Sequence, residues 1–197
     1  TSKVSSHYFI KNNGNILNLV PDLYKAWHAG KSCWKNVKSL NEHSIGIEIQ
    51  NPGHEHGYKK FSIRQILSLK KLLSHLIKKY HIKFQNVLGH SDIAPDRKKD
   101  PGEKFPWKKL AKKKLCFWHG LKDSQIKRHR KKYLNSYEEK LFFKNLNKIG
   151  YIHTKRLRAL NSKKLLIVAF QRRFRQDLIN GKPDKECFLI SRSLLIR

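Results

Sequence analysis

The periodicity of the apolar residues changes about two thirds of the way along this 197-residue chain, and the change limits its possible folds. Before residue 120, short segments with strand periodicity accompany one long helical segment. After residue 135, every apolar pattern has helical spacing. This order predicts an α/β fold, with a mixed central β-sheet flanked by helices, followed by a small all-α C-terminal bundle.

Local signals place the strands of the first part. Residues 7–20 hold two apolar runs around an Asn-Asn-Gly-Asn turn, which is typical of a β-hairpin. In residues 44–50, isoleucines alternate with Gly46 and Glu48, which predicts a strand with Glu48 on the face opposite the isoleucines. Residues 86–89 predict a short strand that leads into His90.

The clearest helical pattern covers residues 62–80. Ser62 and Gln65 fit a capping box at its start. Lysines fill much of one face, and the apolar positions that we expect on the other face are Ile63, Ile66, Leu67, Leu73, Ile77 and Tyr80.

Composition and periodicity together divide the chain into three parts. We expect a domain at residues 1–119, a charged linker at 120–135 and a helical domain at 136–197. Within the last part, helices are predicted at residues 137–149 and 162–174, and Asp184 can cap a shorter final helix.

The formal net charge of +30 has two interpretations, which the sequence leaves open. One is attraction to a polyanion such as nucleic acid, an anionic membrane or a cell-wall polymer. The other is the codon usage of an AT-rich genome, because the lysines are scattered along the whole chain. No nucleic-acid-binding motif is present, so we expect no specific nucleic-acid partner. No apolar run approaches the roughly 18 residues of a membrane span, and the three widely spaced cysteines argue against a disulfide framework.

Residues 89–102 carry the candidate chemistry. The imidazole of His90 and the carboxylate of Asp100, if the loop between them folds back, can hold Zn²⁺ with a position open for water. Lys98 lies on the same side as Asp100 in an extended segment and can stabilise a developing oxyanion. Glu48 can act as a general base. Spacing alone does not decide between these roles and plain ones, which are a hydrogen-bonded histidine, a turn-forming aspartate and a solvated lysine.

Three segments of the chain resemble the zinc-dependent N-acetylmuramoyl-L-alanine amidases, the family related to the peptidoglycan recognition proteins. They are AWHAGKSCW (26–34), SIGIEIQNPG (44–53) and GHSDIAPDRKKDPG (89–102), closed by FPW at 105–107. VSSHYFI (4–10) resembles the family's strand before the hairpin, so the resemblance covers about residues 4–110. The segment SIGIEIQNPG and the helical tail, residues 136–197, are more similar to the envelope branch of this family than to its cytoplasmic recycling branch.

The resemblance implies roles for particular residues. His90 and Asp100 match zinc ligands, Glu48 matches the acid/base glutamate, and Lys98 matches the lysine that stabilises the transition state. The implied reaction is hydrolysis of the amide bond between N-acetylmuramic acid and L-alanine in peptidoglycan. Peptidoglycan and muramyl peptides are then the partners, and the bacterial cell envelope, specifically the periplasm, is the expected location, although no targeting signal is visible in the chain.

Two aromatic residues match positions along the family's substrate groove. They are Trp27 and His28, for which the plain alternatives are an indole packed in the core and a structural loop histidine.

The family's third zinc ligand, a histidine, lies on a strand upstream of VSSHYFI. We expect that strand to be missing from a chain that begins at Thr1, and His7 does not occupy the ligand's place in the motif. The alternative function is therefore a non-catalytic peptidoglycan-binding protein that has lost its zinc site.

The tail resembles a three-helix peptidoglycan-binding module. The resemblance rests on Gly150-Tyr151, AFQRRF (169–174) and GKPD (181–184). We expect this part to retain the protein on the wall without being needed for the chemistry.

Overall fold

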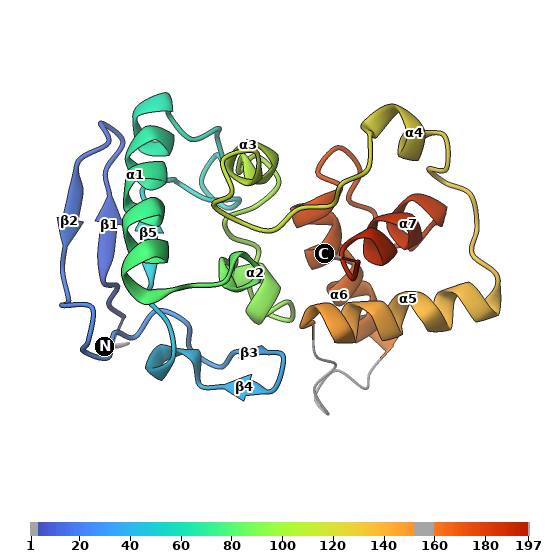
Figure 1. Ribbon diagram of the computed structural model, residues 1–197, viewed down its shortest axis with the longest axis horizontal. Coiled ribbons are helices and arrows are strands. Elements are labelled where there is room, and N and C mark those ends of the chain that lie inside the picture. The colour runs from blue at the N-terminus through green and yellow to red at the C-terminus, as the bar shows by residue number, and fades with distance from the viewer. Residues whose placement is uncertain (1–3, 152–159, 197) are drawn as a thin grey trace. The chain divides into compact units, whose positions relative to one another are not determined.

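The computed structural model of the chain describes residues 4–151 and 160–196 (Figure 1). The chain forms two compact units that do not follow one another along the sequence. The first comprises Thr1–Ser32, Val37–Leu88 and Lys104–Phe117, and the second comprises Cys33–Asn36, Gly89–Glu103 and Trp118–Arg197. The predicted α/β fold is confirmed, and each unit is described by itself below.

A small mixed sheet forms the first unit together with one long helix. Strands β1 (Tyr8–Ile10) and β2 (Ile16–Asn18) pair antiparallel, and β5 (Ile47–Ile49) pairs parallel to β1, so the order is β2-β1-β5. Gly14, at φ +90°, makes the turn between β1 and β2. The predicted hairpin and the predicted isoleucine strand are both confirmed.

Helix α1 (Ile63–Tyr80) packs against β1 and begins at the predicted capping box. The Ser62 hydroxyl accepts a hydrogen bond from the Gln65 N–H, and the Gln65 side chain accepts one from the Ser62 N–H. The buried stripe differs from the predicted one, because Ile63 and Leu67 are exposed. The buried residues are Gln65, Leu69, Leu72, Leu73 and Leu76.

The predicted strand at residues 86–89 is wrong. A 3-10 helix, η2 (Phe84–Asn86), overlaps its first residue, and the turns of this helix use the N–H groups of Asn86 and Val87, which a strand ladder would need. His90 then begins the one-turn helix α2 (His90–Ile93) of the second unit. The remaining short elements of the first unit are β4 (Val37–Lys38), η1 (Leu40–Glu42) and α3 (Trp107–Ala111).

The carboxylate of Asp22, in the loop after β2, connects that loop to strand β1 and helix α1. Asp22 accepts hydrogen bonds from the hydroxyls of Tyr8, at 2.5 Å, and Tyr80, at 2.7 Å, and from the Lys79 ammonium at 3.0 Å. Burial of Asp22 opposes its charge, but these hydrogen bonds outweigh burial and lower its pKa to about 2.

Among its described residues, the second unit contains one strand, β3 (Cys33–Trp34), and five helices. Its helices are α2, α4 (Asp123–Lys127), α5 (Ser136–Ile149), α6 (Leu160–Phe174) and α7 (Lys185–Ser193). Asn135 caps α5, and Asp184 caps α7 by accepting a hydrogen bond from the Cys187 N–H. The three helices predicted after residue 135 are therefore confirmed.

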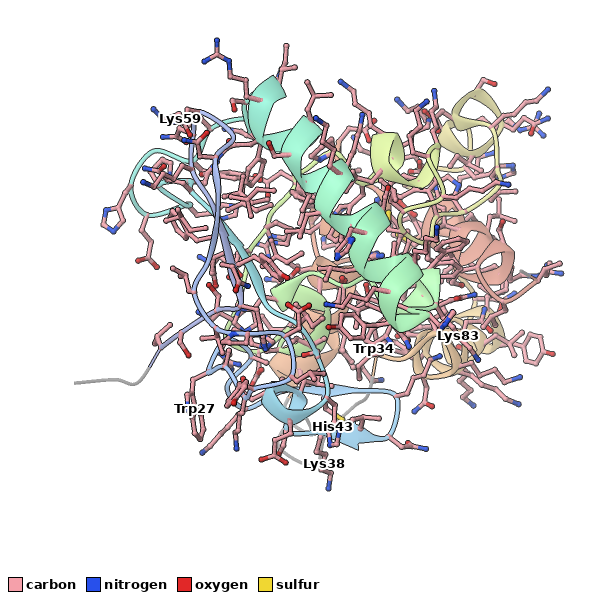
Figure 2. All side chains as sticks on the ribbon, turned by 60° about the vertical axis from the view of Figure 1, so that its left-hand side comes forward. Trp27, Trp34, Lys38, His43, Lys59 and Lys83 are labelled. Atoms are coloured by element: carbon pink, nitrogen blue, oxygen red, sulfur yellow. The ribbon has the colours of Figure 1, made fainter. Side chains whose placement is uncertain are left out.

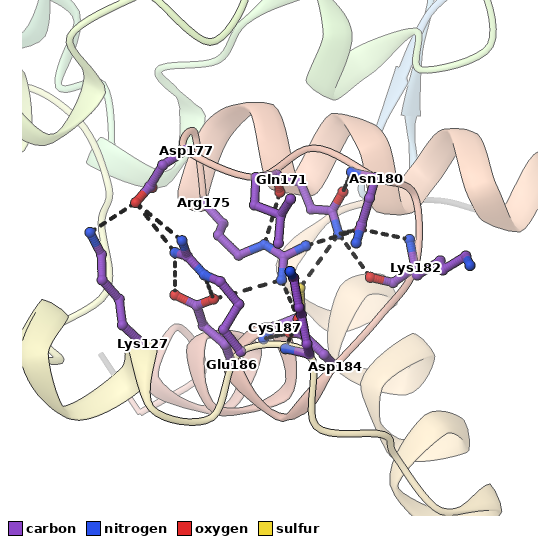
Figure 3. A network of polar contacts seen from close by, with 12 residues as sticks. Lys127, Gln171, Arg175, Asp177, Asn180, Lys182, Asp184, Glu186 and Cys187 are labelled. Atoms are coloured by element: carbon purple, nitrogen blue, oxygen red, sulfur yellow. Dashed lines mark hydrogen bonds and ion pairs between the residues drawn. The ribbon is translucent and has the colours of Figure 1, made fainter.

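An ion network holds the segment before α5 to α7 (Figure 3). The Arg175 guanidinium donates to Asp184 at 2.5 Å, and both side chains are buried. Arg130 donates two hydrogen bonds to Glu186, at 2.6 and 2.9 Å, while Lys127 pairs with Asp177 at 2.9 Å. Residues 120–135, where composition predicts a linker, thus contain α4 and make ordered contacts.

No helix among the described residues is long and apolar enough to cross a membrane. Whether residues 136–197 fold as a domain of their own stays a prediction.

We predict that Arg175→Met lowers the free energy of unfolding by about 3–5 kcal/mol, because it leaves the buried Asp184 carboxylate without its cation. Lys127→Met is the matched control, since its ion pair is about half exposed, and it should cost about 0–1 kcal/mol. Urea unfolding followed by circular dichroism measures both. Equal costs for the two substitutions would contradict this account of the network.

The Asp22 cluster predicts an acid dependence of stability. Its carboxyl has a pKa of about 2 in the folded protein and an ordinary value of 3.8, so its contribution is complete above about pH 4 and is lost as the pH falls towards 2. Wild-type protein should therefore lose more stability than Asp22→Asn across this range. Parallel stability curves for the two proteins, measured by urea unfolding from pH 2.5 to 6, would refute the assignment.

Candidate functional site

The loop at residues 89–102 is closed by its own backbone. The Ser91 N–H donates to the Asp100 carbonyl oxygen at 2.8 Å, which joins the first turn of α2 to the far end of the loop. Between them, the N–H groups of Arg97 and Lys98 both donate to the Ala94 carbonyl oxygen. These bonds bring together side chains that are ten positions apart in the sequence.

His90 and Asp100 converge, as the sequence predicts. His90 Nδ1 lies 3.2 Å from Asp100 Oδ2, with the His90 side chain largely covered and the Asp100 side chain 54% exposed. Burial opposes the charge of Asp100, but the hydrogen bond with His90 and the nearby charges of His90 and Lys98 hold its pKa below the usual value. Arg97 Nη2 lies 3.3 Å from His90 Nε2, so both ring nitrogens have polar neighbours.

The pair fits part of a zinc site. Two ligands that are each about 2.0–2.1 Å from a tetrahedral Zn²⁺ lie about 3.3 Å apart, close to the separation of His90 Nδ1 and Asp100 Oδ2. A catalytic zinc site normally uses three protein ligands. Among residues 4–151 and 160–196, no group of three or more His, Cys, Asp or Glu side chains could hold a metal ion. The donor types and their spacing thus fit zinc, and one more ligand is required.

His7 is a structural histidine of the first unit. It is 1% exposed, its Nδ1 accepts a hydrogen bond from the Gly46 N–H at 3.0 Å, and its Nε2 lies 2.9 Å from the Tyr24 carbonyl oxygen. Nε2 therefore carries the proton and donates, which leaves neither nitrogen available to a metal.

His28 is held in one orientation by the backbone around it. Asn41 Oδ1 accepts hydrogen bonds from the His28 and Ala29 N–H groups, at 3.1 and 2.7 Å, and His28 Nε2 lies 3.3 Å from the Ser44 carbonyl oxygen. A Cβ on Gly46 would lie 2.2 Å from His28 Cγ, so only glycine lets the ring approach this strand. The ring thus has a fixed position at the start of β5.

Trp27 is a surface residue and not a core one. Its side chain projects outward, whereas Trp34 is enclosed (Figure 2). Trp27 is 47% exposed, and its backbone N–H donates to Ser5 Oγ. The Lys25 ammonium lies 4.3 Å from the centre of the Trp27 ring. An exposed indole with a fixed backbone can receive a ligand by stacking.

Glu48 lies in the centre of β5, opposite Phe9 of β1. Its exposed position contrasts with those of Ile47 and Ile49, which are half buried. The alternation places the carboxylate on the polar face, as predicted.

Three buried residues around the loop were not among the predicted site residues. They are Asp92, Tyr151 and Arg173, all within the second unit. Asp92 stands inside the GHSDIAPDRKKDPG segment, but its two partners lie 59 and 81 residues away, so no local pattern connects them.

A family model described as N-acetylmuramoyl-L-alanine amidase matches residues 1–103. N-acetylmuramoyl-L-alanine amidase AmiD of Escherichia coli is 36% identical over 205 residues, covering 98% of this chain and 74% of AmiD. The 1,6-anhydro-N-acetylmuramyl-L-alanine amidase AmpD of E. coli is 38% identical over 105 residues, so the chain spans about half of that enzyme's length, 55%.

Solved structures show the same similarity over the whole chain. The complex of E. coli AmiD with the substrate anhydro-N-acetylmuramic acid-L-Ala-D-γ-Glu-L-Lys has a TM-score of 0.85 and 35% identity, covering 100% of this chain and 80% of the other. AmpDh3 of Pseudomonas aeruginosa has a TM-score of 0.84 and 31% identity, covering 98% and 82%.

Proposed function

This chain belongs to the N-acetylmuramoyl-L-alanine amidase family, and we propose that it is a zinc-dependent hydrolase of muramyl peptides. The bond it cleaves is the amide between the lactyl group of N-acetylmuramic acid and L-alanine. One water molecule is consumed, and the products are a free lactyl carboxylate and a free α-amino group on L-alanine. The observation that carries the proposal is the convergence of His90 and Asp100 in a chain that is similar to a substrate-bound amidase over its whole length.

His90 and Asp100 would hold the metal together with one further protein ligand. Bound zinc supplies a Lewis acid and lowers the pKa of its water. We assign Glu48 as the group that accepts the proton of the attacking water and then passes it to the nitrogen of L-alanine. Lys98 supplies a positive charge for the oxyanion that develops on the scissile carbonyl. In support, Lys98 already lowers the pKa of Asp100 through its charge.

Trp27 and His28 would bind the muramyl peptide. The support is the exposure of the indole and the fixed orientation of the imidazole. A flat apolar face and an oriented ring nitrogen suit a sugar ring and a peptide carbonyl, respectively.

The location and the tail complete the proposal. The substrate, peptidoglycan or its fragments, occurs in the bacterial envelope, and we propose the periplasm as the working compartment. The tail at 136–197 is proposed to contribute to wall binding, and its excess of lysine and arginine favours contact with an anionic polymer.

A second candidate is a peptidoglycan-binding protein without catalysis. It is favoured by one observation: among the described residues the candidate site has a pair of ligand-type side chains, whereas a catalytic zinc site normally has three. The two candidates differ in a single measurable property, because the binding protein would take up peptidoglycan fragments with no stoichiometric zinc.

We predict that the purified protein binds one Zn²⁺ per chain and that His90→Ala abolishes this binding. The imidazole is one of only a few ligands, so its removal leaves too few donors. Metal analysis after dialysis measures the stoichiometry, with His75→Ala, an exposed histidine of α1, as the control. Full zinc occupancy in His90→Ala would show that the metal site lies elsewhere.

We predict that Glu48→Gln keeps zinc binding but lowers turnover of a muramyl tripeptide by about 10²–10⁴-fold, the usual contribution of general acid–base catalysis. The amide is nearly the same size as the carboxylate but cannot accept the proton. Glu55→Gln, which alters an exposed carboxylate of the same unit, is the matched control. Turnover of Glu48→Gln near that of the control would remove Glu48 from the mechanism.

A further inference from the structure

A buried carboxylate lies inside the candidate metal loop. Asp92 is 1% exposed and accepts hydrogen bonds from an arginine, a tyrosine and a backbone N–H. Arg173 Nη1 donates to Oδ2 at 2.6 Å, the Tyr151 hydroxyl donates to Oδ1 at 2.6 Å, and the Gly89 N–H donates to Oδ2 at 2.8 Å. Two of the three donors come from the C-terminal third of the chain.

Both distant donors are themselves fixed. Arg173 is 2% exposed on α6, which packs against α2 (Figure 1). Tyr151 is also 2% exposed and follows Gly150, the residue that ends α5 at φ +138°. The Tyr151 ring lies edge-on to Trp34, with ring centres 5.1 Å apart, and burial together with the Asp92 charge raises the pKa of its hydroxyl, which stays protonated and donates.

Asp92 controls the geometry of the loop from its first turn. Its hydrogen bond with Gly89 ties together the start of α2, the turn on which His90 stands. Ser91, between His90 and Asp92, donates its N–H to the Asp100 carbonyl oxygen. A shift of the Asp92 side chain would therefore move both candidate ligands.

We propose that Arg173 and Tyr151 are positioning residues for the metal loop, acting through Asp92. The inference rests on the proposed function in so far as the loop binds zinc. It gives α6 a part in the chemistry and so replaces the expectation that the tail serves wall binding alone. Groups that orient ligands from outside the ligand set typically change metal affinity by about 10–100-fold when they are removed.

Arg175, the residue that follows the end of α6, provides the matched control. Arg175 is also 2% exposed, and its guanidinium also meets a buried carboxylate, that of Asp184. Asp184 caps α7 and does not belong to the loop at 89–103. Arg173→Met and Arg175→Met thus remove similar buried ion pairs, but only the first pair holds the loop.

The experiment compares wild-type protein with Arg173→Met, Tyr151→Phe and Arg175→Met in the full chain. Hydrogen–deuterium exchange followed by mass spectrometry reports the opening of residues 89–103 without metal. Competition with a chromophoric chelator reports the affinity for Zn²⁺. Thermal unfolding followed by circular dichroism identifies a temperature at which all the proteins are folded, and the comparison is made at that temperature.

We expect Arg173→Met to exchange the loop amides faster than wild type and to bind Zn²⁺ about tenfold or more weakly. Tyr151→Phe, which loses one hydroxyl and keeps its ring, should show the same changes to a smaller extent. If Arg173→Met does not fold, Tyr151→Phe alone tests whether these residues hold the loop. Arg173→Lys, which retains a cation, should recover part of the loss. Arg175→Met should keep wild-type exchange at 89–103 and wild-type zinc affinity.

Loop exchange and zinc affinity in Arg173→Met and Tyr151→Phe equal to those of Arg175→Met would overturn the proposal. If wild-type protein binds no zinc, the proposed function fails, and the exchange of residues 89–103 still decides whether Arg173 and Tyr151 hold the loop.

Discussion

The Asp92 carboxylate is the constraint on which the candidate site depends. A buried carboxylate costs several kcal/mol of desolvation unless it is paired and its oxygens are hydrogen-bonded. Asp92 meets both requirements, through Arg173 and through the donors Tyr151 and Gly89. Because one of these donors starts the loop and the other two lie in the tail, the loop and the tail form a single unit. The side chains of Arg173 and Asp92 are only 2% and 1% exposed, so water cannot replace either partner of the ion pair. The two groups must therefore pair with each other.

The histidines show how contacts separate structure from chemistry. His7 gives both ring nitrogens to the backbone and is 1% exposed, so it serves the fold. His90 Nδ1 faces the partly exposed carboxylate of Asp100, and a metal ion could bind to both groups. The backbone of His28 is held by Asn41, and glycine at position 46 leaves room for the His28 ring.

The fold was predictable wherever the signal is local. Capping residues gave the starts of α1 and α7, and an asparagine-glycine turn gave the β1–β2 hairpin, because these contacts span only a few residues. Apolar residues at helical spacing gave α5. Residues 86–89 were predicted wrongly, since a run of two apolar residues is equally compatible with a turn. In the site, spacing alone left His90 and Asp100 open, and the resemblance decided between their roles. The pairing of Asp92 with Arg173 spans 81 residues and could not be predicted from either segment.

Product analysis in ¹⁸O-labelled water tests the central claim most directly. The substrate is a muramyl tripeptide of the kind bound to AmiD, and mass spectrometry identifies both products. The account predicts a free tripeptide with an L-alanine amino terminus and one ¹⁸O atom in the lactyl carboxylate of the sugar. An intact substrate after prolonged incubation with the zinc-loaded protein, or cleavage after L-alanine instead of before it, would contradict it.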